Sequence, residues 1–320
     1  MLAALALIAA LASGPPGPAG PDPLPASRLA VRTSAGWRTW WSSGRAPATW
    51  REPDAVLQGV LRLTPGAPGM HWGEAELGGS GEAWRTRLVV AVLDPARVSL
   101  GLALRIEARG GTRRGAWRAG DADADVLAAL NAGQFSGAVP WGWLVREGRE
   151  LRPPGTGPLA AALVVDTAGS VHWVAGEDLA AWRRGRGVRH AFQSYPVLLA
   201  GGVVPRPLRA AGAGIDVAHR DARLAIGRRA DGMLVVALTR FDALGSAAGR
   251  LPLGLTTPEM AAVMGALGCR DALALDGGIS GQLLLRDAAG ERRLWSGMRR
   301  VPLGLEVRPR TPPAATASVR

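Results

Sequence analysis

The sequence contains no lysine, and it has one cysteine (Cys269), one asparagine (Asn131) and one tyrosine (Tyr195). Without lysine there can be no P-loop nucleotide site, whose Gly-x-x-x-x-Gly-Lys motif requires that side chain. The single cysteine excludes a disulfide within the chain and a metal site built from cysteines. Because asparagine is otherwise missing, we single out Asn131 as a residue whose role requires an amide side chain.

Metal-binding and catalytic motifs are also missing. Neither an H-E-x-x-H motif nor a G-x-S-x-G elbow occurs. The histidines are dispersed along the chain, at His71, His172, His190 and His219. We therefore predict no cofactor and no metal site. Calcium stays an open alternative, since carboxylates and carbonyls in turns can bind it, but no EF-hand pattern is present.

The charge balance is strongly basic. There are 38 basic and 26 acidic residues, which gives a net charge of +12, and every basic residue apart from histidine is arginine. Residues with AT-rich codons are scarce, so part of this arginine excess reflects codon composition. The arginine pairs are spread along the chain instead of forming one stripe, and nucleic-acid-binding motifs are absent. We predict that the protein does not bind nucleic acid.

The remaining composition favours a globular protein made mostly of strands. Hydrophobic residues make up 48% and charged residues 20% of the 320 positions, enough for a sizeable core. Glycine (44) and proline (24) are abundant, which favours turns and short strands. We predict an α+β fold, a strand-rich mixed sheet domain with a few packed helices.

The chain divides into five segments by composition. Residues 1–12 are entirely apolar and are followed by a small-residue cleavage pattern, as in the hydrophobic region of a signal peptide. No later segment is apolar enough to cross a membrane, so we expect an extracytoplasmic protein, periplasmic or secreted. The expected segments are a signal peptide region (1–12), a proline-rich linker (13–30), a tryptophan-rich N-terminal extension (31–60), the main domain (61–308) and a disordered tail (309–320).

Local patterns predict individual elements of the main domain. We expect strands over residues 87–93 and 98–106, a short helix over 125–130, and hairpins over 159–174 and 224–238. The clearest helix covers residues 257–267, because Thr256 and Glu259 have capping-box spacing and Gly268 is a natural C-terminal stop. Strands over 272–275 and 282–285 follow.

Short polar segments lie at the ends of these elements, and four of them, in chain order, resemble the phosphodiester glycosidase family. Residues 131–135 (NAGQF) are similar to its N-G-G-F-F segment, and residues 193–202 (QSYPVLLAGG) to a second segment. Residues 223–227 (RLAIG) and the helix followed by 275–280 (LDGGIS) are similar to the third and fourth. The resemblance covers roughly residues 60–308. The family that it indicates includes many exported bacterial proteins.

This resemblance implies hydrolysis of a sugar-1-phosphodiester, on a phosphorylated sugar or glycan. We expect Asp276 to activate water or stabilise the sugar cation, and Arg223 to stabilise the departing phosphate through its planar guanidinium. Asn131, which offers a donor and an acceptor, completes the expected catalytic set. The expected substrate-binding residues are Gln193, Ser194, His219, Asp221, Gly277, Gly278, Ser280 and Glu259.

Each of these residues has a structural alternative that the sequence leaves open. Asp276 is also typical of an Asp-Gly turn, Asn131 of a helix C-cap and Glu259 of a helix N-cap. Arg223 could be one surface arginine among many. Ile279 replaces a glycine that is usual in the family, which motivates a second hypothesis, a non-catalytic protein that binds exopolysaccharide or envelope glycan on the same scaffold.

Overall fold

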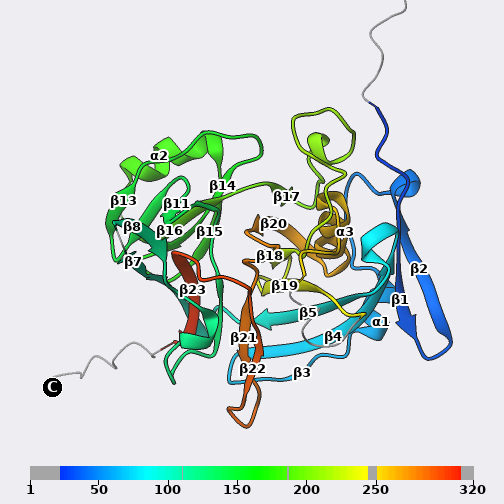
Figure 1. Cartoon of the computed structure of the whole chain (residues 1–320), viewed down its shortest axis with the longest axis horizontal. Coiled ribbons are helices and arrows are strands. Elements are labelled where there is room, and N and C mark those ends of the chain that lie inside the picture. The colour runs from blue at the N-terminus through cyan, green and yellow to red at the C-terminus, as the bar shows by residue number, and fades with distance from the viewer. Residues whose placement is uncertain (1–21, 110, 186, 244–250, 311–320) are drawn as a thin grey trace, which may run out of the picture.

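The computed structural model describes residues 22–109, 111–185, 187–243 and 251–310 (Figure 1). The expected signal peptide region (1–12) lies outside the described residues, as do the first half of the expected linker and nearly all of the expected tail. None of the helices in the described part of the chain is long and apolar enough to cross a membrane.

The largest sheet has nine strands and forms the centre of the molecule (Figure 1). Its order is β17 (Val197–Leu199), β20 (Cys269–Leu275), β18 (Leu224–Arg229), β19 (Leu234–Phe241), β5 (Thr86–Leu93), β4 (Met70–Gly79), β1 (Arg28–Thr33) and β2 (Gly36–Ser42), with β3 (Thr64–Pro65) paired to β4. The short helix α1 (Ala55–Val60) and the capped helix α3 (Thr257–Ala266) pack on one face of it.

Two five-stranded sheets make up much of the rest. The first, which we call the distal sheet, has the order β13 (Arg149–Arg152), β12 (Leu144–Arg146), β16 (Val188–Ser194), β14 (Ala161–Asp166) and β15 (Val171–Ala175), and carries helix α2 (Leu179–Arg184). The second, the facing sheet, has the order β22 (Arg292–Trp295), β21 (Leu283–Arg286), β9 (Ala128–Asn131), β23 (Leu303–Pro309) and β6 (Val98–Leu104).

Short elements connect these sheets. Two hairpins pair β7 (Ile106–Arg109) with β8 (Thr112–Gly115) and β10 (Phe135–Ser136) with β11 (Val139–Pro140). Single 3₁₀ turns cover Ser43–Arg45, Gly81–Ala83, Ala119–Asp121, Gly176–Asp178 and Arg206–Leu208.

The central strands of the nine-stranded sheet are buried on both faces, which explains their continuous apolar sequences. In β5, Leu88 and Val90 belong to the core shared with α1 and α3, whereas Val89 and Ala91 belong to the core shared with the facing sheet. Successive side chains of a strand point to opposite faces, so an uninterrupted apolar run fills two cores at once. The nine-stranded sheet therefore lies between a helical layer and a second sheet.

Most of the predicted elements are confirmed. β5 and β6 match the expected strands, β14–β15 and β18–β19 match the expected hairpins, and α3 begins with the expected capping box at Thr256 and Glu259. The strand-rich character is confirmed as well. The described strand pairings are antiparallel, however, so the sheets are not mixed.

Three predictions are wrong in detail. Residues 128–131 form strand β9 and not the end of a helix, because β9 is paired on both sides, with β21 and β23. Pairing on both sides overrides the weak helical preference of a short alanine-rich segment. The expected linker boundary at residue 30 lies inside β1, and the expected N-terminal extension contributes β1 and β2 to the edge of the nine-stranded sheet. Cys269 is buried at the start of β20.

Candidate functional site

Strand pairing brings Asp276 beside Arg223. β20 and β18 run antiparallel with Leu275 opposite Leu224, so the residue after β20 lies next to the residue before β18. The chain can turn there only because two glycines follow Asp276. A Cβ atom on Gly277 would collide with the carbonyl oxygen of Ala222, and Gly278 has a left-handed φ of 53°. The Asp-Gly-Gly sequence thus permits a close approach that any larger residue would block.

Two carboxyl groups, Asp221 and Asp276, meet at this turn, and we call them the carboxyl pair. Asp221 lies against the turn, since a Cβ atom on Gly278 would be only 2.7 Å from its Oδ2. Oδ1 of Asp221 and Oδ2 of Asp276 are each buried without a hydrogen-bond partner among the described residues. A buried oxygen without a partner costs free energy, so such atoms are typical of sites that bind a ligand.

The environment raises the pKa of both members of the carboxyl pair. Burial is the main cause of the raised pKa of Asp276; the Ser280 hydroxyl and Arg299 oppose it, whereas the charge of Asp221 adds to it. Burial also raises the pKa of Asp221, against the effects of Arg223 and His219. Perturbed carboxyl groups in a partly enclosed position are characteristic of acid–base sites.

Arg223 and His219 border the carboxyl pair on the Asp221 side. Arg223 donates from Nε to the carbonyl of Leu255 (2.8 Å) and from Nη2 to the carbonyl of His219 (2.5 Å). Burial lowers the pKa of its guanidinium, against the attraction of Asp221 and Glu259. His219 is exposed, and its Nε2 lies 3.7 Å from Oδ2 of Asp221. Two bonds therefore fix the plane of Arg223, and Nη1 is its one nitrogen without a partner among the described residues.

Asn131 stabilises the Asp276 turn from the buried side. It is fully buried at the end of β9, where its Nδ2 donates to the carbonyl of Asp276 (2.5 Å) and its Oδ1 accepts from the backbone N–H of Gln282 (3.0 Å). The backbone N–H of Asp276 donates to the carbonyl of Gly133 (3.0 Å). Both ends of the amide are occupied, so Asn131 fixes the turn without facing solvent. It is no helix C-cap.

Gln193 and Ser194 are also buried and fully engaged. Oε1 of Gln193 accepts from the backbone N–H groups of Trp143 (2.9 Å) and Gly155 (2.8 Å), and Oγ of Ser194 donates to the carbonyl of Ala274 (2.6 Å). Ser194 thus joins the distal sheet to β20 near the carboxyl pair. The structure places these two residues in the wall that supports the site, away from its open side.

Glu259 lies at the start of α3, where its carboxylate is completely buried. It accepts from the backbone N–H of Thr256 (2.8 Å) and forms a two-point ion pair with Arg220 (2.8 and 2.9 Å). The hydroxyl of Ser27 donates to Oε1. Every oxygen of Glu259 is in use, so this residue matches the helix-cap alternative and is not brought to the site.

Ser280 and Arg299 complete the Asp276 side. Arg299 donates from Nε to Oγ of Ser280 (2.7 Å), and its Nη2 lies 3.7 Å from Oδ2 of Asp276. Its guanidinium stacks 4.7 Å above the ring of Phe135. Sequence reasoning missed Arg299, because an Arg-Arg pair in an arginine-rich chain carries no signal. The backbone N–H of Gly278, an expected substrate-binding residue, donates to the carbonyl of Ala222 (2.7 Å).

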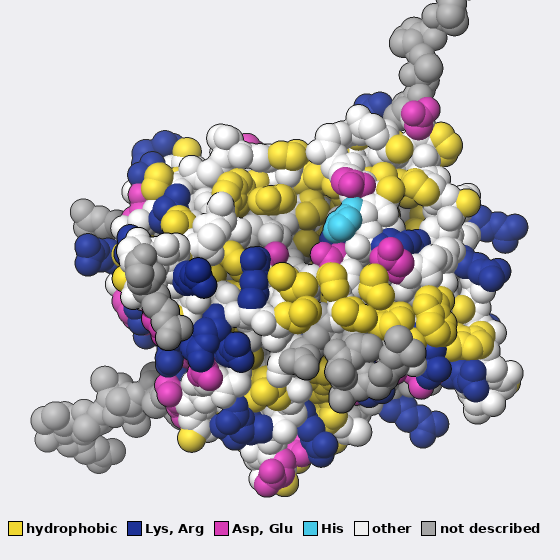
Figure 2. Space-filling view, viewed as in Figure 1, with side chains coloured by type: hydrophobic (Ala, Val, Ile, Leu, Met, Phe, Trp, Pro, Cys, Tyr) yellow, Lys and Arg dark blue, Asp and Glu magenta, His cyan; other side chains and the backbone are white. Residues whose placement is uncertain are grey.

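Figure 2 shows a hollow in the face that carries the ends of β18 and β20, with hydrophobic side chains in it and a histidine and acidic side chains at its edge. Ile279 and Tyr195 are each 38% exposed, and the ring of Tyr195 packs edge-on against Trp141. Such rings suit sugar faces. Among the described residues, no three His, Cys, Asp or Glu side chains gather in a way that could hold a metal ion.

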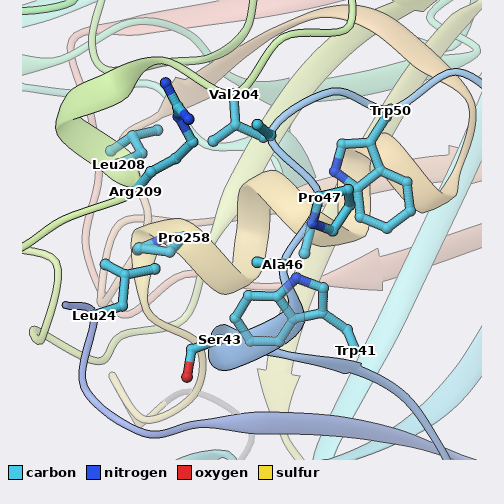
Figure 3. Close-up of a pocket in the computed structure, with 12 residues that line it drawn as sticks. Leu24, Trp41, Ser43, Ala46, Pro47, Trp50, Val204, Leu208, Arg209 and Pro258 are labelled. Atoms are coloured by element: carbon cyan, nitrogen blue, oxygen red, sulfur yellow. The ribbon is translucent and has the colours of Figure 1, made fainter.

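A separate cavity of about 200 Å³ lies against α3 and has a different character (Figure 3). Leu24, Trp41, Trp50 and Leu208 line it, and Arg209 is its one charged residue. Trp50 packs so closely on α3 that a Cβ atom on Gly265 would overlap its indole. No acidic residue lines this cavity, so it lacks the carboxyl groups that glycoside hydrolysis generally uses.

Comparison with known proteins shows the family of the chain. The family model for phosphodiester glycosidase matches residues 124–308, so the chain belongs to the phosphodiester glycosidase family, a family of hydrolases. No curated protein matches the chain at a significant level.

Solved structures show the same fold. The catalytic domain of zebrafish N-acetylglucosamine-1-phosphodiester α-N-acetylglucosaminidase, in a form auto-inhibited by its pro-peptide, is similar with a TM-score of 0.53 and 12% identity, over 83% of this chain and 96% of that one. A hypothetical protein from Synechocystis is similar with a TM-score of 0.52 and 14% identity, over 88% of this chain and 68% of that one.

Proposed function

We propose that the protein hydrolyses a sugar-1-phosphodiester, releasing the sugar from the phosphate. The observation that carries this proposal is the carboxyl pair. Asp221 and Asp276 both have raised pKa values, each has a buried oxygen without a partner, and each lies beside a guanidinium group. Glycoside hydrolysis generally requires two carboxyl groups in different protonation states around an oxocarbenium-like transition state.

The carboxyl pair can supply one ionised and one protonated group, because two nearby like charges disfavour ionisation of both. We assign the ionised role to Asp276, since Ser280 and Arg299 both favour its charged form. Asp276 accepts a proton from water as the water oxygen bonds to C1 of the sugar. The C1–O bond breaks, its electron pair stays on the phosphate oxygen, and the products are a free sugar and a phosphate monoester. Asp221 holds the shared proton, and exposed His219 connects it to solvent.

Guanidinium groups on both sides of the carboxyl pair suit the phosphate. Arg223 has its plane fixed by two carbonyl bonds, which leaves Nη1 for a phosphate oxygen. Arg299 stands on the Asp276 side. Charge-assisted bonds of this kind stabilise the departing phosphate, which is already a good leaving group. Asn131, Gln193 and Ser194 act as positioning residues, and the Gly277–Gly278 turn admits the substrate.

The substrate that we propose is a phosphorylated sugar or glycan outside the cytoplasm, in line with the apolar residues 1–12. The name of the zebrafish relative makes N-acetylglucosamine-1-phosphodiesters the first substrates to test. The purified full chain should release free sugar from UDP-N-acetylglucosamine or a simpler diester. Asp276→Asn and Asp221→Asn should each lower kcat by about 10²–10⁴-fold, the usual contribution of a general acid or base.

Asp231→Asn, on an exposed turn of the β18–β19 hairpin, is the matched control and should keep wild-type turnover. Full turnover by the folded Asp276→Asn variant would overturn the assignment. Parallel assays with EDTA test the calcium alternative. If the reaction depends on calcium, chelation alone would abolish sugar release.

A second candidate function is glycan binding without catalysis. The observation in its favour is Ile279, whose exposed β-branched side chain follows the Gly277–Gly278 turn, at the position where the family usually has glycine. Saturable binding of sugar phosphodiesters with no turnover on any of them would favour this function. In that case Ile279→Gly should restore measurable hydrolysis if the side chain is what blocks the reaction.

A further inference from the structure

A second cavity adjoins the carboxyl pair and has no role in the reaction described above. Its volume is about 650 Å³, three times that of the apolar cavity in Figure 3. Three segments far apart in the sequence line it, namely the β7–β8 hairpin, the turn of β10–β11 and the segment before β23. We call it the basic cleft, and the residues that define it are Arg113, Arg114, Phe135, Gly137, Arg299 and Arg300.

The basic cleft carries an excess of positive charge. Four arginines line it, against one acidic residue, Glu107. Arg113 and Arg114 are both exposed, and no carboxylate of the described residues lies within 4 Å of either one. Glu107 is opposite Arg114 in the hairpin register but forms no ion pair with it. Unpaired guanidinium groups in a concave surface concentrate anions from solution.

Arg299 connects the basic cleft to the carboxyl pair. The same side chain lines the cleft, bonds to Ser280 and lies 3.7 Å from the Asp276 carboxylate. Phe135, beneath the Arg299 guanidinium, belongs to the segment that begins with Asn131 and Gly133, which hold the Asp276 turn. A group bound in the basic cleft would therefore lie next to a sugar phosphate bound at Asp276, close enough to belong to the same molecule.

We propose that the basic cleft is a subsite for a second anionic group of the substrate, on the side of the departing phosphate. This rests on the proposed function. The substrate class is an anionic glycan that bears a further phosphate or carboxylate beyond the scissile phosphodiester. Arg113 and Arg114 bind that group, and Phe135 offers a ring face to the intervening sugar or polyol. A monoanionic diester leaves the cleft empty and gains nothing from it.

The test compares two substrates that differ by one phosphate group, which adds about 1.5–2 negative charges at pH 7. One is the glycerol diester of N-acetylglucosamine-1-phosphate, and the other is the same compound with a second phosphate on the glycerol. Arg113→Ser/Arg114→Ser should raise KM for the substrate with two phosphates about tenfold and leave its kcat unchanged. Both constants should stay unchanged for the substrate with one phosphate. Thr112→Glu, which adds a negative charge to the same cleft, should act in the same direction.

The matched control removes two arginines at the other end of the molecule. Arg32→Ser/Arg38→Ser, in the β1–β2 hairpin, makes the same change in net charge, far from β7 and β8 (Figure 1). It should leave KM unchanged for both substrates. If this control raises KM as much as the cleft variant does, the effect belongs to the overall field of the protein and the subsite is refuted.

Binding measured by calorimetry separates failure of this inference from failure of the proposed function. If the wild type hydrolyses neither substrate, the proposed function fails. Tighter binding of the compound with two phosphates that depends on Arg113 and Arg114 would still support the cleft. Equal binding of both compounds refutes the cleft whether or not hydrolysis occurs. Tighter binding of a single-stranded oligonucleotide than of the anionic glycan also refutes it, since the cleft would then be a nucleic-acid site.

Discussion

Glu259 at the start of α3 and Asp276 at the end of β20 are two acidic side chains withdrawn from solvent, and the sequence marks both as candidate site residues. Glu259 is completely buried, and both of its oxygens have partners, from Thr256, Arg220 and Ser27. Asp276 keeps 23% of its side chain exposed, and its Oδ2 is buried without a hydrogen bond.

The difference between these two carboxylates separates stability from function. A buried carboxylate with every oxygen satisfied stabilises the structure around it and has no capacity left for a ligand. A buried carboxylate oxygen without a hydrogen-bond partner lowers the stability of the protein. Such oxygens are retained at functional sites, where a bound ligand or proton supplies the missing partner. Substitutions at the two positions should therefore have opposite effects on the free energy of unfolding.

The largest effect should follow loss of Glu259. Glu259→Ala removes the helix cap and leaves Arg220 without its ion-pair partner, with 16% of the Arg220 side chain exposed. Breaking a buried ion pair from one side typically costs about 3–5 kcal/mol. We expect a loss of this size in the free energy of unfolding, measured by urea denaturation.

Two variants control this experiment. Glu259→Gln keeps the bond to the Thr256 N–H and should lose less stability than Glu259→Ala. Glu291→Ala, at an exposed position, should change stability by no more than about 0.5 kcal/mol. If Glu259→Ala is as stable as wild type but binds substrate more weakly, Glu259 has a role in substrate binding. The contrast with Asp276 would then be wrong.

An intermediate effect should follow Gly277→Ala. The added Cβ would collide with the carbonyl oxygen of Ala222, so the end of β20 must move away from the start of β18. Overpacking of this kind typically costs about 1–3 kcal/mol. The shift also moves Asp276 relative to Arg223, so we expect a loss of turnover larger than the loss of stability alone explains.

The comparison for this glycine is Gly44→Ala, since a Cβ there meets no atom within 4 Å. Gly44→Ala should keep both wild-type stability and turnover. If Gly277→Ala keeps full turnover as well, the close approach of the two strand ends is not required for activity.

The smallest effect is a pH-dependent gain in stability from Asp276→Asn. The raised pKa of Asp276 means that the unfolded chain ionises first, near pH 3.9, so native stability falls as pH rises through the higher native pKa. Asparagine stays neutral. The variant should match wild type at about pH 4 and be more stable than wild type at pH 8, as followed by thermal unfolding across this range.

Asp231→Asn, whose side chain is half exposed, is the control for this measurement. A constant difference between Asp276→Asn and wild type at every pH would mean that ionisation of Asp276 carries no cost in the folded state. The comparison with Glu259 would then rest on hydrogen bonding alone.

Sequence patterns predicted the elements whose signals are local. The capping box of α3 and the β18–β19 hairpin depend on a few neighbouring residues, so their patterns were sufficient. The Asp-Gly-Gly turn was also predictable from local sequence. Glycine adopts a left-handed φ without strain, and it has no Cβ atom that would collide with a neighbouring strand. Strand β9 was missed because its conformation depends on pairing with β21 and β23, which follow it by about 150 and about 170 residues.

The roles of the site residues depended on partners that no local pattern reveals. Asn131 was singled out by its rarity, but only the structure shows that its amide ties Asp276 to Gln282. Arg299 was missed, since nothing in an arginine-rich sequence distinguishes the guanidinium that lies beside the Asp276 carboxylate.

The sequence by itself determined the family, the capped helix and the glycine turn, because each of these follows from residue types at fixed spacing. The tertiary structure alone decided which polar residues are satisfied and which are not. Asp221 and Asp276 are 55 residues apart, and they become neighbours only because β18 and β20 pair antiparallel. Burial and hydrogen bonding, which set the pKa of a carboxyl group and the availability of its oxygens, are properties of that packing and not of the residue.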